Sequence, residues 1–200
     1  MKKNIILIGG LILSVIISNI GSFFSDGMAL DELRGSVLRL HILAESDSDY
    51  DQNLKIKVRD ALLESGILDG SENLEQAENT AREKLAEIVR ISEDTLRENG
   101  CYLPVSAEVT EMEFDERIYG DITMPAGNYE ALRIKIGSAS GHNWWCVMYP
   151  PLCVPVACEV EDNPETASVF FDEKELDIVH NPQKYKVRFA IWDKLKSIFD

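Results

Sequence analysis

The stretch VLRLHILAESDSDYDQNLKIKVRDALL, residues 37–63, contains the pattern that decides the fold. In its first eight residues, branched apolar side chains alternate with Arg39 and His41. A period of two is typical of a β-strand, whose successive side chains point to opposite faces of a sheet. The alternation predicts a strand over 37–44.

The second half of the same stretch predicts a helix over about 51–64. A polar turn at 46–51 precedes it, and Ser48 or Asp49 is a suitable N-cap residue there. The apolar residues that follow recur at helical spacing: Leu54, Val58, Ala61 and Leu62. A strand followed closely by an amphipathic helix therefore starts the domain.

The residues after this unit predict a second helix and then more strands. Apolar positions at helical spacing indicate one long helix over about 72–98, which ends at Asn99-Gly100. Alternating or apolar runs predict three strands, over 105–114, 129–136 and 144–149. The order of one strand, two helices and then an antiparallel meander is typical of an α+β domain with two layers.

The N-terminus has the layout of a bacterial secretory signal. Lys2 and Lys3 precede an apolar run from Ile5 to Ile17, and small polar residues follow. We expect cleavage near 21–25, although an apolar run that continues to Phe24 would be long enough to remain as a membrane anchor. In both cases the basic end stays inside and the rest of the chain is exported.

The C-terminal part predicts an acidic, loosely structured segment and then an amphipathic helix. The helix has Phe189, Trp192, Leu195 and Phe199 on one side and a basic flank. We expect it either to dock on the domain or to contact a membrane surface or a partner. The predicted organisation is a signal or anchor at 1–25, a connector at 26–36, a domain at 37–158, the acidic segment at 159–181 and the helix at 182–200.

The composition excludes some classes of function. Twenty basic residues against 35 acidic ones give a net charge of −15, whereas nucleic-acid binding requires clustered cations. Membrane contact is therefore expected only through the N-terminal segment and, in one interpretation, the C-terminal helix. No cofactor is expected, since no phosphate-binding or metalloprotease motif occurs.

The run GHNWWCVMYPPLC, residues 141–153, holds the residues with the most chemistry. His142 and Cys146 suggest a catalytic pair, but four residues outside a helix do not bring the two groups together. The spacing of His142 and the cysteines does not match a zinc site. In an exported chain, Cys146 and Cys153 are candidates for a disulfide across a proline turn, although four cysteines permit three pairings.

The remaining candidates are contact residues. Tryptophan and tyrosine often anchor interfaces, so a partner surface is predicted at Trp144, Trp145, Tyr149, Pro150 and Pro151. If 144–149 is a strand, the two tryptophans point to opposite faces. Three aspartates of the 46–51 turn form a second candidate, an acidic patch: Asp47, Asp49 and Asp51.

Two segments together resemble the stage II sporulation protein R family of endospore-forming Firmicutes. They are LRLHILAESDSDYDQNLKIKVRDALL, residues 38–63, and YGDITMPAGNYEALRIKIGSASGHNWWCVMYPPLC, residues 119–153. The sequence NWWCV followed by PPLC is highly specific to that family. Two positions depart from its pattern: Glu45 stands where the family has Asn, and Ala139 replaces a glycine in a G-x-G-x-G run.

The resemblance implies a signal rather than a catalyst. Members of the family are made in the forespore and exported into the space between the two septal membranes. There they activate a membrane-embedded aspartic peptidase of the mother cell, which cleaves pro-sigma-E. Two alternatives stay open from the residues alone: an exported hydrolase that uses Cys146 and His142, and a generic exported structural protein.

Overall fold

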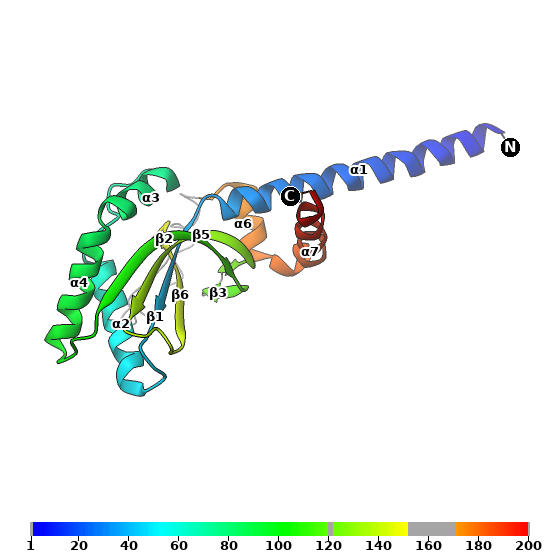
Figure 1. The fold of residues 1–200 in the computed structure, drawn as a ribbon. Coiled ribbons are helices and arrows are strands. Elements are labelled where there is room, and N and C mark those ends of the chain that lie inside the picture. Colours follow the sequence, from blue (N-terminus) through cyan, green and yellow to red (C-terminus); the bar gives the residue numbers. More distant parts are fainter. Residues whose placement is uncertain (1, 120–121, 152–170, 200) are drawn as a thin grey trace.

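The structure is a computed structural model that describes residues 2–119, 122–151 and 171–199 (Figure 1). One mixed sheet of four strands forms its centre, and helices lie on both sides. The helices are α1 (Lys2–Arg34), α2 (Asp49–Glu64), α3 (Leu74–Glu83), α4 (Leu85–Glu98), α6 (Glu173–His180) and α7 (Pro182–Phe199). The strands are β1 (Leu38–Leu43), β2 (Val105–Phe114), β3 (Arg117–Tyr119), β4 (Ile122–Met124), β5 (Gly127–Ile136) and β6 (Asn143–Tyr149).

The α+β class predicted from the sequence is confirmed, but the strand order differs from the expected meander. The order in the sheet is β2-β5-β1-β6, so β1 lies between β5 and β6. It pairs in parallel with β5 and antiparallel with β6. Every residue of β1 except Leu43 is buried, and a strand covered on both faces is stable at the centre of a sheet.

Helices α2, α3 and α4 cover one face of the sheet (Figure 1). Ser48 is the N-cap of α2, and its side chain accepts a hydrogen bond from the Asp51 amide. The first apolar core joins these helices to the alternate residues of β1 and β5, including Leu40, Ile42, Leu132 and Ile134. The packing of α2 on β1 agrees with the strand and helix that residues 37–63 predict.

The long helix expected over 72–98 is two helices that meet at Lys84. The Lys84 amide still bonds to the Thr80 carbonyl and closes α3, and α4 starts at the next residue. The Lys84 ammonium group donates to the Ile67 carbonyl at 3.0 Å. This tertiary contact holds the break between two segments whose apolar spacing is otherwise continuous.

The opposite face carries a second apolar core, which the sequence did not predict. The stretch expected as a connector at 26–36 is helical as far as Arg34, and Ala29, Leu30 and Leu33 are buried in this core. Part of the segment expected to be loosely structured forms α6, which begins with a capping box between Asp172 and Glu175. Residues 159–170 of that segment lie outside the described residues.

A tight loop after β5 brings together the two positions that depart from the family pattern, Glu45 and Ala139. Ala139 has a φ of 54°, a left-handed conformation that favours glycine. The Ser138 amide donates to the Glu45 carboxylate, and the Ser140 amide donates to the Glu45 carbonyl at 3.2 Å. Glu45 therefore holds the loop in which Ala139 is strained.

Replacing Ala139 with glycine is expected to raise the free energy of unfolding by about 0.5–1 kcal/mol. The change removes the left-handed strain, and the greater entropy of the unfolded chain offsets part of that gain. Urea unfolding of the full chain in a mild detergent measures it. The matched control is Ala126→Gly, at an exposed residue without positive φ, which is expected to lose stability. Equal losses in the two variants would contradict the prediction.

Candidate functional site

The structure does not bring the predicted catalytic pair together. Cys146 is buried within β6 and is disulfide-bonded, so its sulfur is not a free thiolate. His142 precedes β6, and its ring is largely exposed with Nδ1 2.5 Å from the Asp47 carboxylate. A strand rises about 3.3 Å per residue, which carries Cys146 away from that ring.

The disulfide partner of Cys146 is not among the residues that the structure describes. Cys153, the predicted partner, lies outside them, so the pairing stays a prediction. Cys101 is buried and free. Within the described part of the chain, no group of three histidine, cysteine or acidic side chains could hold a metal ion.

The two tryptophans lie on opposite faces of β6, as expected for adjacent strand residues. Trp144 packs in the first core, and the Arg59 guanidinium lies 4.3 Å from the centre of its ring. Trp145 faces the other side, where its ring stacks on His41 with centroids 4.0 Å apart. Both side chains are partly buried, so each contributes to packing.

The other predicted contact residues differ in exposure. Tyr149 and Pro150 are buried, whereas Pro151 is exposed in a turn. Asp47 accepts hydrogen bonds from the His142 amide and ring, and Asp51 accepts from the hydroxyls of Ser46 and Ser48. Asp49 lies in the first turn of α2. Partner contact at these positions stays a prediction.

A row of side chains across all four strands ends at Trp145 on the edge strand β6. The register places Glu108 opposite Arg133, Arg133 opposite His41, and His41 opposite Trp145. Lys135 lies one row further along β5, and Arg117 of β3 lies 5.9 Å from the centre of the Trp145 ring. We name this surface the Trp145 patch: His41, Arg117, Arg133, Lys135 and Trp145.

The charge of the Trp145 patch comes from its arginines and lysine, not from His41. Burial lowers the pKa of His41, and nearby Arg133 and Lys135 lower it further, to about 4. Glu108 neutralises part of this charge because it lies 2.9 Å from Lys135 and 3.7 Å from Arg133. The patch is thus an aromatic surface with a basic border on a strongly acidic chain.

A buried cation lies next to the patch, on the same face of β1 as His41. Arg39 is fully buried, and its Nε donates to the Cys146 carbonyl at 3.1 Å. Its guanidinium also donates to the Tyr119 hydroxyl at 2.8 Å, and that hydroxyl donates to the Trp145 carbonyl at 3.2 Å. Burial lowers the pKa of Arg39. These bonds tie β3 to β6 beside Trp145.

The residues that form this surface lie in the part of the chain that matches one known protein family. The family model for stage II sporulation protein R matches residues 34–158. The chain belongs to the stage II sporulation protein R family. It is 41% identical over 119 residues to stage II sporulation protein R of Bacillus subtilis (strain 168), a match that covers 58% of this chain. No solved structure matches.

The match spans about half of the relative's length, 53%. The region shared with the stage II sporulation protein R family includes the whole sheet and the Trp145 patch. Helices α6 and α7 lie beyond it, as does nearly all of α1.

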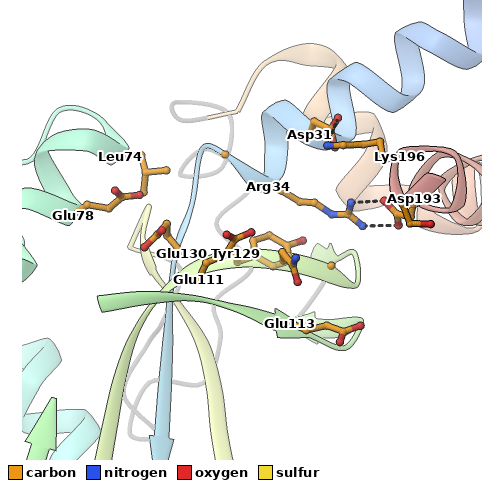
Figure 2. Close-up of a pocket in the computed structure, with 14 residues that line it drawn as sticks. Asp31, Arg34, Leu74, Glu78, Glu111, Glu113, Tyr129, Glu130, Asp193 and Lys196 are labelled. Carbon is orange, nitrogen blue, oxygen red and sulfur yellow. Dashed lines mark hydrogen bonds and ion pairs between the residues drawn. The ribbon is translucent and has the colours of Figure 1, made fainter. Parts of the chain in front are cut away.

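A cleft of about 820 Å³ lies between α1, α3, α7 and the end of the β2–β5 pair, and most of its lining residues belong to the family region (Figure 2). Six carboxylates line it: Asp31, Glu78, Glu111, Glu113, Glu130 and Asp193. Burial and nearby Glu130 raise the pKa of Glu78. The cations at its wall are paired, Arg34 with Asp193 at 2.7 Å and Lys196 with Asp31 at 3.1 Å. The cleft is therefore unsuited to an anionic cofactor.

Helix α1 has the length and composition of a membrane span. The candidate span covers Ile8–Arg34, and the mean hydropathy of its most apolar window is 1.8. None of that window is buried against the rest of the protein. A signal sequence has the same properties, so α1 is compatible with either a signal or an anchor.

Proposed function

We propose that this chain is an exported signalling protein of endospore formation that activates a membrane-embedded aspartic peptidase. Activation would lead to cleavage of pro-sigma-E in the mother cell. Family membership supports a role in sporulation, and the apolar N-terminal helix supports export from the forespore into the intermembrane space. The proposal makes the domain a ligand of the peptidase rather than a catalyst.

The observation that carries the proposal is the Trp145 patch. It combines a partly exposed tryptophan with three cations on a chain that is otherwise strongly acidic. Such a surface suits an acidic or aromatic segment of the extracytoplasmic part of the peptidase. Trp144 packs under α2, so we assign the contact to Trp145 rather than to both tryptophans.

Activation then requires that the domain bind the active state of the peptidase more tightly than its inactive state. A ligand shifts an equilibrium only if it binds one state more tightly than the other. The rigid support of the patch by Arg39 and Tyr119 favours recognition of one arrangement of the peptidase. We infer that the domain stabilises the active, self-associated state.

Neutralising the patch is expected to reduce pro-sigma-E processing at least tenfold. The double variant Arg133→Gln with Lys135→Gln removes two charges, and Trp145→Ala removes the aromatic anchor. The matched control is Arg90→Gln with Arg97→Gln, two exposed cations on α4 at the other face. Processing is measured by immunoblot at equal exported protein, and binding by co-purification with the peptidase.

Three outcomes would contradict the proposal. Normal processing in both patch variants would show that the Trp145 patch is not the contact surface. Failure of the wild type to co-purify with the peptidase would favour a generic structural protein. Loss of function in His142→Ala, with folding and patch binding unchanged, would favour the hydrolase. A Cys146→Ser with Cys153→Ser variant removes both the proposed disulfide and the nucleophile, so it cannot separate those two roles.

A further inference from the structure

Helix α7 has two apolar sides, and only one of them is covered. Tyr185, Phe189 and Trp192 face inward, where the first two belong to the second core. The second side carries Val187, Ile191, Leu195 and Ile198, which are 38 to 72% exposed. Their spacing of four, four and three residues places them in one stripe along the helix. We name this stripe the outer face of α7.

The inward side of α7 is fixed against α1 where the apolar run of α1 ends. The Trp192 ring lies 5.9 Å from Phe23 and 5.7 Å from Phe24. It also covers Gly27, where a Cβ atom would lie 2.2 Å from the indole. The Trp192 Nε1 donates to Asp31 at 3.1 Å, and Arg188 forms an ion pair with Asp26. These contacts, on both sides of Gly27, fix α7 against the end of the apolar run of α1.

The apolar surface of α1 continues toward this contact. Nine large apolar side chains between Ile8 and Phe24 are 49 to 67% exposed. Apart from the contact of Trp192 with Phe24, the described part of the domain leaves them uncovered, and none of the apolar window of α1 is buried. An apolar helix surface of this length requires a bilayer or an equivalent apolar environment.

The charge of α7 is opposite to that of the chain. Between 182 and 199 there are five basic residues and a single acidic one, whereas the chain carries −15. Lys186 and Lys194 border the outer face. Lysine side chains beside an apolar stripe can extend along it and place their ammonium groups among lipid phosphates.

We propose that the outer face of α7 docks onto the surface of the bilayer that α1 enters. The fixed contact with α1 places α7 at the end of the apolar run, and the lysines complement the phosphates of anionic lipid. A single bilayer would cover both the apolar outer face of α7 and the exposed apolar side chains of α1. The inference goes beyond the proposed function and does not depend on it.

A photo-crosslinking experiment on the full chain tests this contact. p-Benzoylphenylalanine replaces Ile191 in the outer face, and in the control it replaces Tyr102, which is 82% exposed between α4 and β2. The proteins are reconstituted in liposomes of phosphatidylcholine and phosphatidylglycerol and irradiated. Lipid adducts on the labelled peptide, counted by mass spectrometry, are expected to be at least tenfold more abundant at 191.

Val187 provides a second labelling position if the Ile191 variant fails to fold. Equal lipid labelling at the outer face and at 102 would overturn the proposal. Adducts between two copies of the chain at 191, without lipid adducts, would overturn it as well and indicate a dimer interface. Pro-sigma-E processing is not part of the readout, so this result is separate from that of the proposed function.

Discussion

Replacing Arg39 with alanine is expected to lower the free energy of unfolding by about 3–5 kcal/mol. The side chain is fully buried, and its hydrogen bonds satisfy the Cys146 carbonyl and the Tyr119 hydroxyl. The guanidinium lies over aromatic rings, 4.4 Å from the centre of Phe114 and 5.0 Å from that of Tyr129. Alanine would leave a cavity between these rings and two polar groups without their donor.

The control is Arg39→Met, which fills most of the same space without a charge. A buried cation is costly to desolvate, and sulfur packs well against aromatic rings. The methionine variant is therefore expected to be more stable than the alanine variant by about 2 kcal/mol. Urea unfolding followed by near-ultraviolet circular dichroism compares them. Equal losses would show that the hydrogen bonds, not the filled volume, hold this site together.

Acid is expected to destabilise the domain by about 3 kcal/mol through His41 alone. Its pKa is about 4 in the folded state against 6.5 for an ordinary histidine, and each pKa unit corresponds to about 1.36 kcal/mol. The unfolded chain binds the proton first, so stability is complete above pH 6.5 and is lost as the pH falls toward 4. The cause is burial, together with the cations Arg133 and Lys135 of the neighbouring strand.

His41→Phe isolates this effect from the titration of carboxylates. Phenylalanine keeps a ring against Trp145 but binds no proton. Urea midpoints of the wild type and the variant, taken at pH 7 and at pH 4.5, give the difference that belongs to His41. A variant that loses as much stability as the wild type between these pH values would contradict the assigned pKa.

The local elements were predictable because their signals are local. The alternation at 37–44 and the helical spacing of Leu54, Val58 and Leu62 predicted β1 and α2, and Ser48 was one of two predicted caps. The break at Lys84 was not predictable, since the bond to the Ile67 carbonyl joins residues that are distant in sequence. The position of β1 between β5 and β6 depends in the same way on packing over the whole sheet.

The candidate site was predictable only in part. The sequence singled out Trp145, and its placement opposite Trp144 followed from strand geometry. The cations Arg133 and Lys135 were missed, because only the parallel pairing of β1 with β5 brings Arg133 beside His41. A polar residue within an apolar strand, such as Arg39, was the available signal for the buried cation next to the patch.

The continuous helix at 26–34 limits how far the domain can move. A flexible connector of that length would reach roughly 30 Å at about 3.3 Å per residue. As a helix that rises about 1.5 Å per residue, the same nine residues span only about 13 Å, and α7 braces them. With α1 uncut and inserted in a bilayer as proposed above, the domain would therefore stand at one height above the membrane. A partner in an opposing bilayer would then be engaged only where the two bilayers approach within about the size of the domain itself.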